Sequence, residues 1–164
     1  MQIRRATAGA IFVALGTATG IHVRQVLEKV KPDRPYWLLD SWDGRRSASD
    51  PSIEYPESTD FDSVRRSFAA WPNVRFLRGI IPASLSHLPA DPIAFAYFCL
   101  GDTEAEIAAF EMLLPRLSPG GIFVLNGFGR KRTSNAQRKQ FIDLAARHSN
   151  ELLILPTAHA ILFA

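Results

Sequence analysis

Short apolar segments alternate along this chain with longer stretches in which apolar residues recur every three or four positions. The short segments have the length of strands, and the longer spacing is typical of helices with one buried face. Strands are expected at residues 10–15, 36–39, 74–77, 93–100, 122–125, 152–155 and 160–163. Helices are expected at residues 18–30, 61–70, 103–117 and 134–148. This order predicts an α/β fold with a doubly wound, mostly parallel sheet.

The last two expected strands are separated only by a short segment around Pro156 and Thr157. Because no helix fits between them, they are expected to pair antiparallel and to close a seven-stranded sheet with a C-terminal hairpin. Residues 47–60 are rich in Ser, Pro, Asp and Glu and predict a surface loop. The whole chain, residues 1–164, is expected to form a single domain of ordinary size.

Residues 113–129 contain the clearest local signal, which is the end of a helix, a Ser-Pro-Gly-Gly turn and a short apolar strand. The strand residues 122–125 are apolar without alternation, so we expect helices to cover both of their faces. Ligands of such sheets bind at the carboxyl ends of the strands. Asn126, Gly127 and Phe128 are therefore candidate site residues.

Composition narrows the class of protein without naming a ligand. With 47% hydrophobic and 21% charged residues the chain is globular, and its net charge of +3 is modest. The basic residues are scattered, with small clusters at Arg45-Arg46, Arg65-Arg66 and Arg130-Lys131-Arg132. We favour a solvated basic surface over a nucleic-acid interface. One cysteine excludes an intramolecular disulfide and suits a reducing compartment. The first twenty residues are superficially similar to a secretion signal, but we interpret them as the first core strand and expect a cytoplasmic protein. No apolar run approaches the roughly 20 residues of a membrane span.

Two loops at the expected carboxyl edge suggest nucleoside chemistry. Gly16 and Gly20 flank the turn after the first strand, where the backbone can approach a ligand, although a tight turn alone explains them equally well. Asp40 ends the second strand about 20 positions later, where α/β folds hold ribose hydroxyls. Together with the first loop, this position favours a ligand-binding role in which Asp40 accepts hydrogen bonds from both ribose hydroxyls. The alternative is an aspartate that only stabilises a turn.

Four segments, in order along the chain, carry a family resemblance: LLDSWDG, RFLRGIIPASLSHLP, PRLSPGGIFVLNGFG and ILPTAHAILFA. The chain resembles the macrocin O-methyltransferase (TylF-like) family of class I S-adenosylmethionine-dependent methyltransferases, whose motifs include DSF-x-G, G-x-F-x-x-T-L-P and LPTG. The resemblance implies that S-adenosylmethionine is bound by Gly16, Thr17, Gly20, Asp40, Ser41, Gly79 and Ile80. The first loop would line its methionine part, the end of the second strand its ribose, and the end of the third strand its adenine.

The chain departs from this family where the family binds a divalent metal. Ala14 replaces the acidic residue of an E-x-G motif. Where the family has the two aspartates of a D-x-D motif, this chain has Cys99 and Gly101. Where the family has an Asp-Asp pair, it has Asn126 and Gly127. Magnesium prefers carboxylate and water oxygens. We therefore expect no metal, and we expect the N-terminal helices that cover the cofactor and substrate in the family to be missing.

Several single residues have both a chemical and a structural interpretation. Asp102 lies one residue beyond the D-x-D position and could supply at most one ligand. Cys99 fits a small core thiol better than a nucleophile. His22 could act as a general base but fits a surface histidine better. His159 could contact a substrate, and Trp42 could pack against the cofactor.

The leading hypothesis is a metal-independent methyltransferase that uses S-adenosylmethionine to methylate a hydroxyl or similar nucleophile of a small molecule. The alternative is a catalytically inactive domain of the same fold that serves as a binding or assembly partner, as a homo-oligomer or with a partner chain that covers the exposed cleft. A nicotinamide-dependent oxidoreductase is a weaker third reading, because Gly16 is not followed by the G-x-G-x-x-G spacing. We expect neither nucleic acid nor membrane as a partner.

Overall fold

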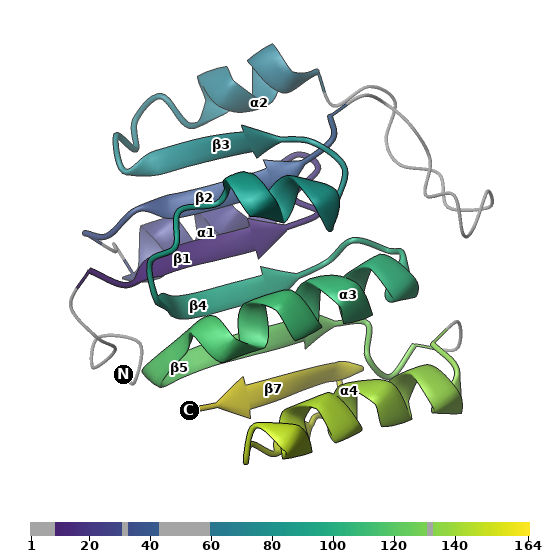
Figure 1. Ribbon diagram of the computed structural model, residues 1–164. Helices are drawn as coiled ribbons and strands as arrows, with labels where there is room; N and C mark the ends of the chain where they lie inside the picture. The colour runs from purple at the N-terminus through teal and green to yellow at the C-terminus, as the bar shows by residue number, and fades with distance from the viewer. Residues whose placement is uncertain (1–8, 31–32, 43–59, 131–132) are drawn as a thin grey trace.

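The computed structural model describes residues 9–30, 33–42, 60–130 and 133–164, which form a seven-stranded sheet with helices on both faces (Figure 1). The strands are β1 (Ile11–Leu15), β2 (Tyr36–Asp40), β3 (Val74–Arg78), β4 (Ile93–Phe98), β5 (Leu117–Asn126), β6 (Leu152–Ile154) and β7 (His159–Phe163). The helices are α1 (Ile21–Val30), α2 (Phe61–Ser67), α3 (Thr103–Leu113) and α4 (Asn135–Arg147), with short 3-10 helices η2 (Ala83–His87) and η3 (Leu114–Arg116). The loop predicted at residues 47–60 lies, except for Asp60, outside the described residues.

The strand order is β3-β2-β1-β4-β5-β7-β6. The first five strands in the sequence are parallel, β7 runs antiparallel to β5, and β6 and β7 form the predicted antiparallel hairpin. The predicted seven-stranded, mostly parallel sheet is thus confirmed. Within the described residues, no helix is long and apolar enough to cross a membrane.

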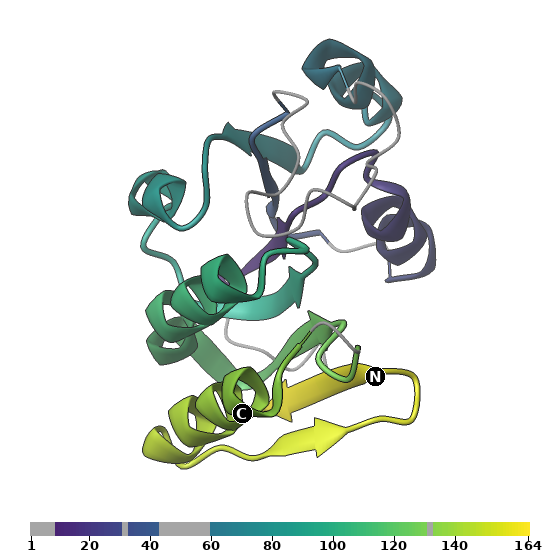
Figure 2. The same ribbon diagram turned by 90° about the vertical axis from the view of Figure 1, so that its right-hand side faces the viewer.

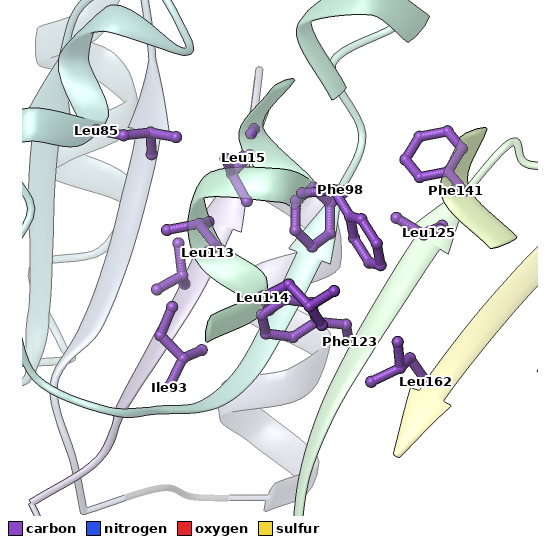
Figure 3. Packing of buried hydrophobic residues seen from close by; sticks show 14 of the residues in the cluster. Leu15, Leu85, Ile93, Phe98, Leu113, Leu114, Phe123, Leu125, Phe141 and Leu162 are labelled. Carbon is purple, nitrogen blue, oxygen red and sulfur yellow. The ribbon is translucent and has the colours of Figure 1, made fainter. Parts of the chain in front are cut away.

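Helices cover both faces of the sheet (Figure 2), and each face has its own apolar core. One core packs α1 and α2 against β1 to β3, through residues such as Val23 and Phe68. The other packs η2, α3 and α4 against β4, β5 and β7, with Phe98, Phe123 and Phe141 completely or almost completely buried (Figure 3). Alternate residues of β4 supply both cores, as expected for a central parallel strand.

Three helices differ from the sequence prediction by three or more residues at one end. The first helix begins at Ile21 and not at residue 18, because Ala18 and Gly20 have positive φ angles of 44° and 75° that a right-handed helix excludes. The helix after β4 ends at Leu113 and tightens into η3, since Pro115 has no N–H to continue the α-helical bonds. The helix predicted at 61–70 begins at Phe61, with Asp60 as its N-cap, but ends at Ser67.

The Ser-Pro-Gly-Gly segment is not a turn that precedes the strand, as predicted, but the irregular first part of β5. The chain reverses earlier, at η3. Residues 118–121 form a bulge in β5: Ile93 of β4 pairs with Leu117, but Phe95, only two residues later, pairs with Ile122. The expectation that both faces of residues 122–125 are covered is also wrong for the described part of the chain. Ile122 and Val124 are only half-buried, since α1 and α2 lie over β1 to β3 and leave this face of β5 without a described helix (Figure 2).

Candidate functional site

The topology locates the candidate site between β1 and β4. These strands are neighbours in the middle of the sheet, but the helices that follow them, α1 and α3, lie on opposite faces. Ligands of open α/β sheets bind at such a switch point, outside the carboxyl ends of the strands. The loop of residues 16–20 after β1 and the segment of residues 99–102 after β4 therefore border the site.

Gly16 brings these two segments into direct contact. Its φ angle is +70°, and its N–H donates to Leu39 O at 2.9 Å. A Cβ at this position would lie 2.3 Å from Cys99 O, far inside van der Waals contact. Only glycine therefore allows the loop after β1 to lie against the end of β4 in this conformation.

Asp40 joins the ends of β1 and β2. Its Oδ2 accepts from Ala18 N at 2.8 Å, and its Oδ1 accepts from Ser41 N at 2.7 Å and from Trp42 N at 3.4 Å. A carboxylate has about four acceptor sites, so these bonds leave about one for a ligand. The sequence predicted that Asp40 would hold both ribose hydroxyls, and the geometry leaves room for one strong bond.

The end of β3 completes this side of the site. Gly79 N donates to Asp40 O at 2.9 Å, which fixes the following residue, Ile80, beside the end of β2. Ile80 is 64% exposed, which is unusual for a large apolar side chain at the carboxyl edge of a sheet. Ser84, on η2, lies against Gly79 and is buried.

Two buried hydroxyl oxygens near these loops have no hydrogen-bond partner among the described residues: Thr17 Oγ1 and Ser84 Oγ. Buried hydroxyls are normally satisfied, so a polar ligand atom is a reasonable partner for each. Sequence reasoning named Thr17 but missed Ser84, although Ser84 stands at the threonine position of the G-x-F-x-x-T-L-P motif. A ligand with polar groups near β1 and a flat apolar group near β3 fits these residues.

Gly20 and Trp42 have structural reasons for their positions. A Cβ on Gly20 would lie 2.6 Å from the Phe68 ring, so this glycine allows α1 and α2 to pack closely. Trp42 is buried against Phe61 and Phe76, and its Nε1 donates to Ala18 O at 3.2 Å. The structure thus places the Trp42 ring in the core beneath the loops, where it supports the site from behind.

A chain of polar contacts follows the ends of β4 and β5. Asn126 Nδ2 lies 2.9 Å from Cys99 Sγ, and Arg130 Nη2 donates to Asn126 Oδ1 at 3.2 Å. The sequence left Asp102 as the one carboxylate near the D-x-D position that could bind a metal. In the structure its side chain instead caps α3 by accepting from Glu104 N and Ala105 N. No group of three His, Cys, Asp or Glu side chains in the described ranges could hold a metal ion.

Tyr97 and His22 border the same edge from β4 and α1. Their ring centroids are 5.6 Å apart. Burial, reinforced by the nearby Cys99 thiol, raises the pKa of Tyr97 to about 12, so its hydroxyl stays protonated at neutral pH. Tyr97 can therefore donate or accept a hydrogen bond here but cannot serve as a base. His159 lies opposite Asn126 on β7, and its Nδ1 is within 2.8 Å of Thr157 O.

Buried tyrosines predict a loss of stability in alkaline solution. Burial raises the pKa of Tyr36 well above its usual 10.0, and that of Tyr97 to about 12. Below pH 10 the tyrosine hydroxyls stay protonated in both the folded and the unfolded chain. Above pH 10 only the unfolded chain releases these protons, so the free energy of unfolding falls. We expect the urea midpoint to be constant from pH 8 to 9.5 and to fall between pH 10 and 12. Tyr36→Phe should reduce this slope, and an equal slope in both proteins would contradict the prediction.

No family model matches the sequence. A search of curated proteins also finds no match. The structure, in contrast, is similar to many solved structures of methyltransferases.

Three of these similar structures illustrate the shared fold. The O-methyltransferase NovP has a TM-score of 0.73 and 20% identity over 98% of this chain and 73% of its own. The calicheamicin methyltransferase CalS11 has a TM-score of 0.70 and 19% identity over 99% and 74%. The Podospora anserina methyltransferase PaMTH1, solved with bound S-adenosylhomocysteine, has a TM-score of 0.66 and 12% identity over 99% and 73%. The chain therefore has the Rossmann-like fold of these methyltransferases.

Proposed function

We propose that this protein is an S-adenosylmethionine-dependent methyltransferase, similar to the macrocin O-methyltransferases, that acts on a hydroxyl or similar nucleophile of a small molecule. The observation that carries the proposal is that Asp40, at the end of β2, bonds to Ala18 in the loop after β1 and to Gly79 at the end of β3. These bonds gather three loops at the carboxyl edge of the sheet, beside the switch point between β1 and β4. The shared fold supports it, because NovP and CalS11 are methyltransferases of the same topology. Fold alone does not determine activity, so the site carries the proposal.

The residues at these loops match the parts of the cofactor. Gly16 and Thr17 would hold its methionine part, with Thr17 Oγ1 bonded to the amino or carboxylate group. Asp40, with Ser41, would accept from one ribose hydroxyl, and the exposed side chain of Ile80 would pack on one face of the adenine. When bound, S-adenosylmethionine supplies a methyl group that is attached to a cationic sulfur. The sulfur becomes a neutral thioether when the methyl group is transferred.

The donors at the ends of β4 and β5 do not suit magnesium. Cys99, Gly101, Asn126 and Gly127 offer a thiol and one amide, whereas magnesium is usually bound through one or two carboxylates together with water. We propose that transfer proceeds without a metal and depends on holding the acceptor oxygen close to, and in line with, the methyl group. In this proposal the acceptor lies next to the ends of β4 and β5, where the Tyr97 hydroxyl can hydrogen-bond it.

Calorimetric titration with S-adenosylhomocysteine tests the proposal. We expect binding in the micromolar range, and no binding of NADH under the same conditions. Asp40→Ala should weaken the affinity at least tenfold, about 1.4 kcal/mol, because it frees Ala18 N and removes the ribose acceptor. Asp143→Ala removes an exposed carboxylate on α4 and is the matched control. No binding at millimolar concentration would reject the cofactor and favour the non-catalytic alternative.

A further inference from the structure

The segment after β5 holds Arg130 in a defined position at the candidate site. Arg130 N donates to Gly127 O at 2.9 Å, and the buried Thr133 Oγ1 donates to the same oxygen at 3.1 Å. Arg138, from α4, donates to Phe128 O at 3.0 Å and to Arg130 O at 2.8 Å. Two side chains thus fix the backbone of this segment, although loops at such edges are often variable.

The side chain of Arg130 turns back over the end of β5. It lies so close to Gly127 that a Cβ there would be 3.1 Å from Arg130 Cδ. Its Nη2 donates to Asn126 Oδ1, and the amide of Asn126 contacts Cys99 Sγ in turn. Because Gly16 lies against the backbone of Cys99, this chain of contacts leads from the proposed cofactor loop to the guanidinium.

The guanidinium brings to this edge a positive charge that no described carboxylate neutralises. Within the described part of the chain, its only hydrogen bond is the one to Asn126, and no carboxylate lies within 4.0 Å of it. Arg138 and Arg66, in contrast, direct their guanidiniums to neighbouring oxygens of the protein. Arg130 is exposed, so at least three of the five guanidinium donors are available to a ligand.

From this geometry we infer that Arg130 binds an oxyanion of the methyl acceptor, so that the acceptor is an acid carrying a carboxylate or a phosphate. The inference rests on the proposed function for its physiological meaning. A planar guanidinium forms two parallel hydrogen bonds with either group, whereas a neutral acceptor would leave the charge unpaired. Asn126 acts as a positioning residue, because its Oδ1 holds Nη2 and its Nδ2 is held at Cys99.

The test uses NMR titration of the S-adenosylhomocysteine-saturated protein with matched small probes. Benzoate and phenyl phosphate carry the two candidate oxyanions, and benzamide is the neutral analogue of benzoate. We expect at least one anion to bind at least tenfold more tightly than benzamide and to shift the Asn126 side-chain amide signals. Arg130→Gln should abolish the difference, and Arg130→Lys should retain part of it. Arg147→Gln, which removes an exposed guanidinium on α4, should leave it unchanged.

The outcomes separate this inference from the proposed function. Equal affinity for benzamide and both anions, or anion binding that survives Arg130→Gln, would overturn the inference even when S-adenosylhomocysteine binds normally. If the wild-type protein fails to bind S-adenosylhomocysteine, the same titrations without it still test the oxyanion site, and only the proposed function fails. Preference for benzoate over phenyl phosphate, or the reverse, identifies which oxyanion the acceptor carries.

Discussion

Gly16→Ala is expected to abolish measurable binding of S-adenosylhomocysteine, with a loss of at least a hundredfold in affinity. The new Cβ would lie 2.3 Å from Cys99 O and 2.7 Å from Leu100 Cα, and both are backbone atoms that cannot rotate away. The loop after β1 must therefore move away from the end of β4, and Thr17 moves with it. A hundredfold loss corresponds to about 2.7 kcal/mol.

Gly9→Ala is the matched control for this substitution. Gly9 has a similar positive φ, +79° against +70°, but a Cβ there has nothing within 4 Å. Both variants incur the cost of a left-handed alanine, about 1 kcal/mol, and only Gly16→Ala adds the collision. Calorimetry for affinity and urea unfolding for stability separate the two effects. Wild-type affinity in Gly16→Ala would show that the loop does not hold the cofactor.

Phe110→Ala is expected to destabilise the fold by about 3–5 kcal/mol, as is typical of a large aromatic residue removed from a core. Phe110 on α3 is completely buried, with ring centroids 5.9 Å from Phe98, 6.0 Å from Phe123 and 5.4 Å from Phe141. These contacts join α3 to β4, β5 and α4, so the loss affects the whole half of the sheet behind the candidate site. Since small domains are stable by only about 5–15 kcal/mol, we expect the variant to retain little folded protein at 37 °C.

Met112→Ala, two residues further along the same helix, provides the comparison. Its side chain is 48% exposed, so the same kind of truncation should cost less than about 1 kcal/mol. Urea unfolding followed by circular dichroism measures both variants. A cost for Phe110→Ala as small as that for Met112→Ala would show that α3 does not pack on the sheet as described.

The candidate site was only partly predictable from the sequence. The positions of Gly16 and Asp40 at the ends of apolar segments predict them as site residues, whereas only the family resemblance implies Gly79. The structure brings all three together at one edge. Ser84 was missed although it stands at a motif position, because only the structure shows that its hydroxyl is buried beside Gly79 with no hydrogen-bond partner among the described residues. Arg130 belongs to a basic cluster in the sequence and was assigned to a solvated surface, whereas its guanidinium contacts Asn126 at the end of β5.

The sequence by itself determined the elements, their order and the α/β class, because apolar periodicity and chain breakers are local properties. It also determined which residue types stand at the ends of β4 and β5, and hence the poor match to a magnesium site. Only the tertiary structure decided that Asp40 bonds to Ala18, that the reversal before β5 occurs at η3, and that Arg130 turns back over Gly127. These features depend on contacts between segments distant in the sequence or on close packing around single atoms, neither of which any local pattern encodes. The switch point at the carboxyl ends of β1 and β4 exists only once these two strands lie side by side in one sheet.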